Sequence, residues 1–590
     1  MEEKYKSIIE TCNEQISSYN RKANIVGIVK LLLVALLLYS GYKLYNVGMV
    51  IGWLLLFCVG LILFVAFSVW HNQIFEQISY EKGIGKIAGD NLKRLSGEWR
   101  GFEDVGEEYR DQNHSYAMDL DIVGKNSLFQ FLNSTNTYYG RKIFAKDLLD
   151  ADYSVDEIKE RQKAIGELSK DYDWTSNVEY FFSKIGVDDT FLKLLSEMKT
   201  AEQFSKVRWL KGLFRIFRFL TVIAFLYVII RGTEKGTLFL TGMLLLQLIC
   251  WIIGGHKTKK YLGSLKGMSY KLSPYNDVIC EVMEREFTCD ALKDMKAKLG
   301  QAQRAIAQLT RISENIKHCN NEIANFLLNV LFLWDYKNVF DYEKWRQQYA
   351  DDVEIWFMEL GKLESLISFT NLVRNCSHVC VPNLSSEKKY LKVKHMGHPL
   401  ISNKERVCND FTMENEIVMI SGSNMSGKST FMRTVGINLV LANAGSFVCA
   451  KEMEYSLVRV MTSMRIVDYT TEGISTFYSE LLRIKEIVDA AGKDNNVLFL
   501  IDEIFRGTNS VDRLKGAEGV IERLQTLGSC GFLTTHDLEL CKMEKAENNI
   551  VNYSFYESYK EDEMYFDYKI KKGIAKTTNA EFLLKKVGIL

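Results

Sequence analysis

The feature that most constrains this chain is the run from Gly48 to Trp70, which contains no charged side chain. A helix needs about 20 apolar residues to cross the hydrocarbon core of a bilayer, and this run is long enough. It has no polar face, so a buried helix of a water-soluble domain does not explain it. We therefore predict a transmembrane helix. Ile25 to Tyr42, charged only at Lys30, is predicted as its hairpin partner, with Lys30 reaching the interface or facing a helix.

A second apolar pair lies between residues 213 and 255. Phe219 to Ile230 is short, whereas Gly236 to Gly255 is longer and free of charge. Basic clusters, which are typical of the cytoplasmic ends of membrane helices, flank the pair at Lys206, Arg208, Lys211, Arg215, Arg218, Lys257, Lys259 and Lys260. We predict a second membrane hairpin, and the alternative is a buried helical hairpin in a soluble domain. Two hairpins leave every large segment on one side of the membrane.

A glycine-rich motif follows the apolar run Ile417–Ile420 and precedes a helix-like segment, Phe431–Ala444. Its residues are Gly422, Ser423, Asn424, Met425, Ser426, Gly427, Lys428, Ser429 and Thr430. A strand, a glycine loop and a helix in this order form a phosphate-binding loop, whose backbone N–H groups and helix N-terminus face the phosphates. We expect Lys428 to reach the outer phosphates of ATP and Ser429 to ligate Mg²⁺. Because ATP is cytoplasmic, we expect a multi-pass protein of the cell membrane with its large segments in the cytoplasm.

Two further strands are predicted to end in charged or polar side chains. Val497–Ile501 is a continuous apolar run, typical of a strand buried on both faces of a parallel sheet, and it ends in Asp502 and Glu503. Asp502 is expected to hold Mg²⁺ through water, and Glu503 to act as general base toward the attacking water. The strand 531–535 ends in His536, which is a candidate sensor of the γ-phosphate or a structural histidine.

Composition limits the remaining functions. The 74 basic and 74 acidic residues balance, so contact with a nucleic acid must come from a local patch. One candidate is the segment from Lys257 to Lys317, where Lys and Arg outnumber Asp and Glu, although a solvated helix surface also explains it. Twelve cysteines without paired metal spacing indicate reduced thiols, and three prolines indicate long helices.

Several motifs together resemble the MutS family of mismatch-repair ATPases. The phosphate loop, with Asn424–Met425 and the following Phe431–Arg433, is similar to that family's version. So are, in order, His398–Pro399 before the loop, and after it Gly473–Glu480, Asp502–Ser510 and Thr534–His536. The resemblance covers about the last 200 residues, and Ser127–Leu168 also resembles the start of the family's lever domain.

The resemblance implies an ABC-type α/β ATPase that works as a dimer. Ser475 of one subunit would then touch the γ-phosphate bound by the other, and Asp512 would lie near the dimer seam. ATP binding would close the dimer and swing helical levers. The predicted organisation is multi-domain: a cytoplasmic segment (1–24), membrane hairpins (25–70 and 213–255), a linker (71–117), an all-α lever domain in two parts (118–212 and 256–390) and the ATPase domain (391–590).

The chain also departs from the family. The space before the lever domain is too short for the family's mismatch-sensing and connector domains. The Phe-x-Glu letters of the sensing domain occur at Phe555–Glu557 and Phe357–Glu359, but both lie in the wrong place and are interpreted as chance. Val407 stands near the position where an adenine-stacking aromatic residue is expected. Mismatch recognition by this chain alone is therefore not expected.

Three functions remain open from the sequence. The first is a membrane-anchored MutS-like ATPase, a homodimer that uses ATP to move helical levers around a partner such as DNA. The second is an ATP-driven mechanotransmission protein of the membrane that does not bind DNA. The third, an ABC-type exporter, is less favoured because four predicted spans are few and carry no obvious polar pathway.

Overall fold

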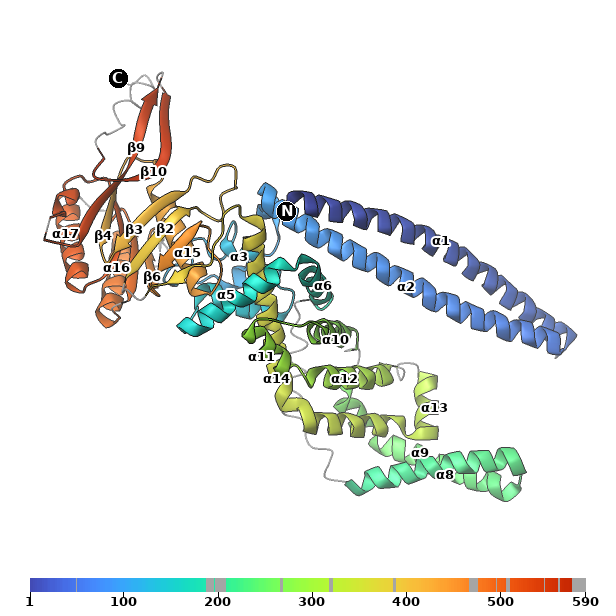
Figure 1. Cartoon of the computed structure of the whole chain (residues 1–590). Helices are drawn as coiled ribbons and strands as arrows, with labels where there is room; N and C mark the ends of the chain where they lie inside the picture. Colours follow the sequence, from blue (N-terminus) through green and yellow to red (C-terminus); the bar gives the residue numbers. More distant parts are fainter. Residues whose placement is uncertain are drawn as a thin grey trace. The chain divides into compact units, whose positions relative to one another are not determined.

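The computed structural model describes residues 1–48, 50–186, 196, 208–265, 269–317, 322–385, 389–465, 476–494, 496–505, 510–545, 547–560 and 563–575. The chain divides into two compact units (Figure 1). The first comprises Met1–Asn133, Asp147–Tyr180 and Phe369–Leu590, and the second comprises Ser134–Lys146 and Phe181–Ser368. Each unit is described by itself.

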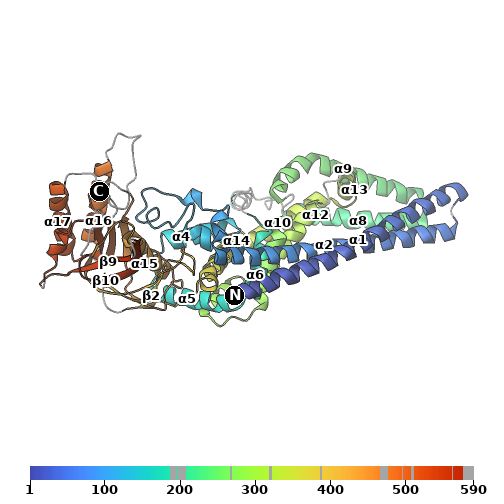
Figure 2. The same ribbon diagram turned by 90° about the horizontal axis from the view of Figure 1, so that it is seen from above.

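The first unit begins with a long helical hairpin, α1 (Glu2–Val47) and α2 (Ile51–Ser96). The two helices lie side by side in both views (Figures 1 and 2). The buried positions of α1 recur every seven residues, at Tyr5, Cys12, Val26, Leu33 and Ser40, with the partly buried Tyr19 completing the series. A seven-residue repeat is the signature of a left-handed coiled coil. Each helix is about 70 Å long at 1.5 Å per residue.

Four described helices contain a stretch that is long and apolar enough to cross a membrane: α1, α2, Lys211–Arg231 and Glu234–Gly255. In α1 and α2 the apolar side chains of this stretch point outward, and Leu31, Leu38 and Ile62 are about 70% exposed (71%, 71% and 68%). Lys30 faces the partner helix, with its Nζ 3.5 Å from Nδ1 of His71. By length and composition the helices match the two predicted hairpins, and the crossing itself stays a prediction.

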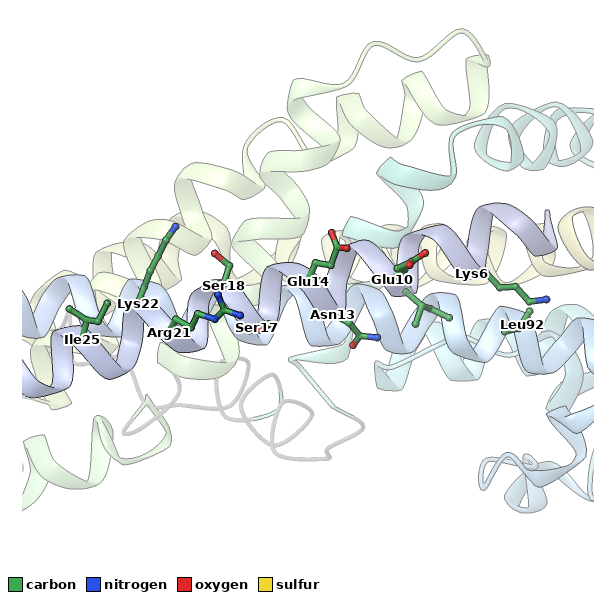
Figure 3. A pocket seen from close by; sticks show the side chains of 11 residues that line it. Lys6, Glu10, Asn13, Glu14, Ser17, Ser18, Arg21, Lys22, Ile25 and Leu92 are labelled. Carbon is green, nitrogen blue, oxygen red and sulfur yellow. The ribbon is translucent and has the colours of Figure 1, made fainter.

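The first half of α1 is polar on its outer face. A shallow groove of about 990 Å³ follows it, and all but one of its lining residues come from α1 itself (Figure 3). Both signs of charge are present, with Lys6, Arg21 and Lys22 beside Glu10 and Glu14. The groove ends at Ile25, where the apolar stretch begins. This half of the hairpin therefore has the surface of a helix pair in water.

The polar end of the hairpin is fixed to the rest of the first unit by buried polar side chains. Arg94 of α2 donates from Nε to the Phe131 carbonyl (2.8 Å) and from Nη2 to the Asn133 carbonyl (2.8 Å). Asn375 Nδ2 donates to Oδ1 of Asn91 on α2 at 3.0 Å. Tyr5 of α1 is fully buried. The hairpin therefore meets the rest of the unit through specific hydrogen bonds and not through a loose linker.

A buried carboxyl group lies in the same region. Burial raises the pKa of Glu179, on α6 (Tyr172–Ser183), to about 7, although Arg94 and Arg374 oppose the shift. Arg374 in turn donates from Nη2 to the Leu168 carbonyl (2.9 Å) and to Thr175 Oγ1 (2.7 Å). The two guanidinium groups thus both bind backbone carbonyls and offset the burial of Glu179.

The hairpin anchor can be tested with Arg94→Ala. The change leaves two carbonyls without their donor and removes one of the cations near Glu179, so we expect a loss of about 3–5 kcal/mol of stability. Lys93→Ala is the matched control, because Lys93 is half exposed, its ion pair is with Asp90 on its own helix, and such a pair is worth at most about 1 kcal/mol. Its other contact is with the Phe102 ring, whose centre lies 5.8 Å from its Nζ. Thermal unfolding in detergent compares the two variants. Equal melting temperatures would show that Arg94 does not anchor the hairpin.

Two β-sheets and their helices form the carboxyl-terminal part of the first unit. The strands are β1 (Asn383–Leu384), β2 (Tyr390–Met396), β3 (Asn409–Glu414), β4 (Ile417–Ser421), β5 (Glu452–Tyr455), β6 (Arg459–Ser463), β7 (Val497–Asp502), β8 (Cys530–Thr535), β9 (Ile550–Lys560) and β10 (Glu563–Lys572). The helices are α15 (Lys428–Asn443), α16 (Thr476–Lys493) and α17 (Ser510–Thr526), with the short η7 (Leu540–Met543). A smaller sheet has the order β1-β5-β2-β3, and a larger one has the order β10-β9-β4-β8-β7-β6.

The larger sheet is parallel from β9 to β6, and only β10 pairs in the antiparallel direction. Its central strands β4, β7 and β8 are entirely buried. Alternate residues serve the two faces. Met419, Phe499 and Leu533 pack in one core with side chains of α16 and α17, whereas Phe532 contacts Phe431 of α15. The carboxyl ends of the central strands are thus held between helices on both faces.

Four shorter helices join the hairpin to this part of the first unit. They are η1 (Glu98–Gly101), η2 (Glu107–Tyr109), α3 (Leu128–Leu132) and α5 (Val155–Lys170). The segment before α3 contacts the large sheet, because Asp119 Oδ2 accepts from Thr462 Oγ1 (2.6 Å) and from the Met464 amide (3.0 Å). Helix α5 starts in a capping box between Ser154 and Glu157.

The second unit is helical. Its elements are α4 (Tyr138–Leu149), α8 (Arg208–Arg231), α9 (Glu234–Tyr261), η4 (Gly263–Leu265), α10 (Ser269–Glu284), α11 (Asp290–Lys298), α12 (Ala302–Lys317), α13 (Glu322–Phe332) and α14 (Trp334–Asn375), of which α4 and α14 extend into the first unit. Helices α4 and α14 cross closely, because a Cβ on Gly361 would lie 2.8 Å from the Tyr139 backbone. Glu364 then accepts from Thr137 Oγ1 at 2.5 Å.

Candidate functional site

Gly422–Gly427 form the connection between β4 and α15, and the last residues of the motif, Lys428–Thr430, begin α15, so strand, loop and helix follow in the predicted order. Gly422 has φ 150° and Gly427 has φ 106°, and side chains disfavour both values. Space is also short, because a Cβ on Gly422 would lie 2.9 Å from the Phe555 carbonyl oxygen. Helix α15 begins at Lys428 directly after Gly427. The amino end of α15, with its positive dipole end, therefore opens on the loop.

The polar side chains of the loop are turned inward. Lys428 Nζ donates to the carbonyls of Gly422 (2.8 Å) and Ser423 (2.9 Å). Ser426 Oγ is buried and has no hydrogen-bond partner among the residues that the structure describes. A buried hydroxyl without a partner is costly unless a ligand satisfies it. The loop thus holds a cation and a free hydroxyl at the place where the sequence predicts phosphate.

Asp502 reaches this loop from the end of β7. Its Oδ2 accepts a hydrogen bond from Ser429 Oγ at 2.8 Å, and its Oδ1 accepts one from Thr534 Oγ1 at 2.5 Å. Strand register explains the meeting, since Asp502 pairs with Thr534, and Ser421 pairs with Thr535. A carboxylate and a hydroxyl are the hard oxygen ligands that Mg²⁺ prefers, usually one or two from the protein with the rest from phosphate and water. Among the residues that the structure describes, no group of three or more His, Cys, Asp or Glu side chains is placed to hold a metal ion by itself.

Glu503 and His536 meet beside this pair. His536 Nε2 lies 2.5 Å from Glu503 Oε1. Glu503 has a φ of 51°, which is uncommon for a residue with a side chain, and its amide donates to Thr534 Oγ1 at 3.0 Å. The buried Thr534 therefore fixes the Asp502 carboxylate and the backbone of Glu503 at the end of β7.

The segment after Glu503 is tied to α16. The Phe505 amide donates to Oε1 of Glu480 at 2.5 Å, and Phe505 also has a positive φ, 62°. Glu480 closes the motif Gly473–Glu480 that the sequence analysis singled out. Glu503 and Phe505 thus both have left-handed backbone conformations, which are unfavourable for residues other than glycine. Contacts with the surrounding residues must hold this segment of backbone in place.

A cavity of about 430 Å³ lies against the loop. Glu503 and residues Asn424–Phe431 line one side of it, and His398 and Val407 line another. Aromatic side chains come from the last two strands, Phe555 on β9 and Tyr568 on β10. Val407 is thus at the cavity, as the sequence indicated, but aromatic rings also reach it from positions that the sequence analysis did not identify.

A further residue that sequence reasoning missed is Glu557. Its carboxylate accepts a hydrogen bond from Ser423 Oγ in the loop. Phe555 and Glu557 lie on β9, which runs parallel to β4 in the sheet. Their letters were interpreted as a chance Phe-x-Glu match, and in the structure they belong to the wall of the loop. Phe555 and Glu557 could be assigned to the site only from the pairing of β9 with β4. These strands are far apart in the sequence, so no local pattern indicates the pairing.

The structure thus brings together five of the predicted site residues: Lys428, Ser429, Asp502, Glu503 and His536. Asp512 is exposed in the first turn of α17. Its place at a dimer seam stays a prediction. Ser475 lies outside the described residues. None of the cysteines that the structure describes forms a disulfide.

His398 offers a test of the cavity wall. Burial, with smaller contributions from Arg406 and Arg433, lowers the pKa of His398 to about 3, so the folded protein binds fewer protons than the unfolded chain between pH 6.5 and 3. Stability conferred by neutral His398 is present above pH 6.5 and is lost as pH falls, by about 2 kcal/mol between pH 6.5 and 5.

The measurement is thermal unfolding in detergent at pH 7 and pH 5. His398→Asn keeps an acceptor for the Leu400 amide, which donates to His398 Nδ1, and it does not titrate. We expect the melting temperature of the wild type to fall more than that of the variant. An equal fall in both proteins would contradict the assignment of a neutral, buried His398.

Comparisons with known proteins agree on one family. The family model for MutS domain V matches residues 418–581. DNA mismatch repair protein MutS of Alkaliphilus oremlandii (strain OhILAs) is 31% identical over 239 residues, which are 39% of this chain and 27% of that protein. The protein of the same name from Clostridium botulinum (strain Loch Maree / Type A3) is 28% identical over 306 residues, or 50% and 32%. That of Carboxydothermus hydrogenoformans is 26% identical over 348 residues, or 58% and 40%. The matches span less than half of each relative's length.

Proposed function

Because this chain is a MutS-family protein, we propose that it is a Mg²⁺-dependent ATPase, anchored in the cell membrane, whose homodimer moves its helical part when ATP binds. The observation that carries the proposal is the convergence at the carboxyl ends of the parallel strands. There the Ser429–Asp502 hydrogen bond of 2.8 Å lies beside the Glu503–His536 pair. A hydroxyl, two carboxylates, a lysine and an imidazole around one glycine loop are the groups that phosphoryl transfer needs.

The loop binds the phosphates in this proposal. Backbone N–H groups from Gly422 to Lys428 and the amino end of α15 face them, and Ser426 Oγ gains a partner. Lys428 Nζ exchanges the carbonyls of Gly422 and Ser423 for phosphate oxygens. Ser429 and Asp502 hold Mg²⁺, which would neutralise charge on the phosphate oxygens. The fit rests on these residues already being in contact with one another.

Glu503 is the proposed general base. Its side chain lines the cavity and is partly exposed. It can therefore accept a proton from a water molecule beside the terminal phosphate. His536 holds the Glu503 carboxylate until nucleotide arrives, and it then turns a ring N–H toward the phosphate. The imidazole thus couples the orientation of the base to the presence of the γ-phosphate.

A second subunit completes the site in this proposal. Ser475 of the partner subunit would approach the γ-phosphate, and Asp512 at the start of α17 would lie at the seam. The exposed position of Asp512 supports this placement. Binding energy from the completed site would favour the closed dimer over the open one, and the difference would drive the helical part.

The membrane anchor consists of the two hairpins, with the helical and ATPase parts in the cytoplasm. The four apolar stretches and their outward-facing side chains support this proposal. DNA is a proposed partner, since relatives of this chain are named DNA mismatch repair proteins. The basic segment Lys257–Lys317 is the proposed contact surface.

A second candidate function is mechanical transmission to the membrane without DNA. The seam of the α1–α2 coiled coil supports it, because the seam runs from the buried Tyr5 to Ser40 without a change of period. Motion at the polar end of such a hairpin is passed on to its apolar end. DNA binding and mechanical transmission differ in one measurable property, which is affinity for DNA.

The catalytic assignment predicts different defects for two substitutions. Glu503→Gln keeps the shape of the base but removes its charge, so we expect ATP affinity to persist and turnover to fall at least 100-fold, on the order of a general-base contribution. Lys428→Ala removes the cation of the loop, so we expect nucleotide binding itself to be lost. Binding of a fluorescent ATP analogue and phosphate release measure the two effects in detergent-purified protein. Undiminished turnover in Glu503→Gln would remove Glu503 from the base role.

DNA binding predicts a steep dependence on salt. Arg304, Arg311 and Lys317 are exposed on α12. In Arg304→Glu/Arg311→Glu we expect weaker binding and a shallower salt dependence than in the wild type. The control Lys163→Glu/Lys542→Glu makes the same change of net charge on exposed lysines outside the basic segment. Fluorescence anisotropy with homoduplex, mismatched and branched DNA measures affinity. If the ATP-loaded wild type binds none of them at low salt, the mechanical function is favoured.

A further inference from the structure

Helix α13 has an apolar face on the surface of the second unit. Ile323, Phe326 and Leu327 are 72%, 45% and 50% exposed. Phe326 and Leu327 follow Ile323 by three and four residues, so all three lie on one side of the helix. A water-soluble helix exposes charged or polar side chains at such positions. Helix α13 lies within the second part of the predicted lever domain (256–390).

Helix α13 also packs on the hairpin α8–α9, and Phe326 lies at the edge between this contact and the exposed face. The Phe326 ring lies 6.1 Å from the ring of Trp251 on α9. Gln247 of α9 is fully buried, and with its amide oriented to satisfy all its neighbours it accepts from Thr221 Oγ1 (2.6 Å) and donates to the carbonyls of Val330 (2.7 Å) and Leu331 (3.1 Å). The last carbonyls of a helix lack partners within the helix. Gln247 therefore joins α8, α9 and the carboxyl end of α13 in one polar contact.

The start of α14 strengthens this packing. Tyr336 Oη donates to the Cys250 carbonyl at 3.0 Å, and Trp251 Nε1 donates to Asp335 Oδ2 at 3.2 Å. Phe214 of α8 packs in one cluster with Leu333 and Tyr336. Helix α13 and the first turns of α14 are thus fixed to the hairpin by side chains from both of its helices.

The position of these contacts along α9 determines the depth of α13 relative to the bilayer. The apolar stretch of α9 runs from Glu234 to Gly255, and α13 contacts it at Gln247 and Trp251. The part from Glu234 to Gln247 is about 20 Å long at 1.5 Å per residue. The hydrocarbon core of a bilayer is about 30 Å thick. A hairpin that crosses this core must therefore carry α13 into the membrane boundary.

We propose that α13 is a membrane-embedded helix of the cytoplasmic leaflet, with Ile323, Phe326 and Leu327 in contact with lipid acyl chains. The proposal rests on the proposed membrane insertion of α8–α9. Lipid is the occupant because Phe326 of α13 contacts Trp251 of α9, and the next two residues of α9, Ile252 and Ile253, are also apolar and are 66% and 78% exposed. The second membrane element thus has three helices, and α14 begins at the membrane boundary.

The side chains next to α13 have the chemistry of that boundary. Trp251 and Trp334 flank the helix, and Lys337 Nζ lies 4.3 Å from the centre of the Trp334 ring. Tryptophan and lysine are enriched where the hydrocarbon meets the headgroups. Trp334 Nε1 is also bound, to the Asn315 carbonyl at 3.2 Å. Trp334, with its N–H group bound and the Lys337 ammonium above its ring, therefore has the surroundings expected of a side chain among lipid headgroups.

Site-directed spin labelling tests the proposal in full-length protein whose accessible native cysteines are replaced with serine. Phe326→Cys carries a nitroxide in nanodiscs of phosphatidylcholine and phosphatidylglycerol, and its accessibility to oxygen is compared with that to a water-soluble nickel chelate. Ile323→Cys is a second label site in case Phe326→Cys disturbs the contact with Trp251. Leu238→Cys, at a 77% exposed position of α9, reports on the hairpin. Arg304→Cys on α12 is the aqueous reference.

We expect the oxygen-to-nickel ratio at residues 326 and 323 to approach that at residue 238 and to exceed that at residue 304. A lipid-like ratio at 238 with an aqueous ratio at 326 and 323 would overturn the inference and leave the hairpin in the membrane. Aqueous ratios at all positions would overturn the membrane anchor itself. Low accessibility to both reagents at 326, with spin–spin broadening between labelled copies, would show that a second copy of the chain covers α13 and would also overturn the inference.

Discussion

Thr534 fixes the Asp502 carboxylate and the backbone of Glu503 in the site. Its hydroxyl donates to Asp502 and accepts from the Glu503 amide, and its own position is set by parallel pairing of β8 with β7 and β4. Because parallel strands end at one edge of a sheet, a loop after β4 and polar residues after β7 and β8 must meet there. The glycine loop, Asp502, Glu503 and His536 depend on that register, and a shift of one residue would turn each side chain to the opposite face.

The parts of the site that could be predicted are those encoded locally. Gly422–Thr430 carries its own strand, loop and helix, and Asp502 and Glu503 follow an apolar run that only a central strand explains. The contributions of Phe555, Glu557 and Tyr568 could not be predicted, because they depend on β9 pairing with β4 across more than a hundred residues of chain. The Phe-x-Glu letters at 555–557 resemble a mismatch-sensing motif. In the structure, their position on β9 makes these residues part of the wall of the glycine loop.

The fold shows the same division. Length and the absence of charge are enough to predict a helix in runs such as Gly48–Trp70. The structure has helices at all four predicted spans. The apolar residues of α13 have a spacing that is equally typical of a core helix, so the sequence cannot tell which face is exposed. Burial in the folded unit separates Asn325 and Asn329, which are inside, from Phe326 and Leu327, which are outside. An asparagine facing inward is the reverse of the usual amphipathic pattern, and here the two side chains satisfy each other, since Asn329 Nδ2 donates to Asn325 Oδ1 at 2.6 Å and the Asp335 amide donates to Asn329 Oδ1 at 2.9 Å.

The seven-residue seam of α1 has a mechanical consequence. It passes from the polar half of the hairpin into the apolar half through Ala23 and Val26, which pack with Ile74 and Ile78. A hinge between the polar and apolar halves would require a break in the seven-residue repeat. The described residues of α1 contain no such break. A twist applied near Arg94 would therefore be transmitted along the seam from the polar half of the hairpin to its apolar half, because the described residues of α1 keep one seven-residue register throughout.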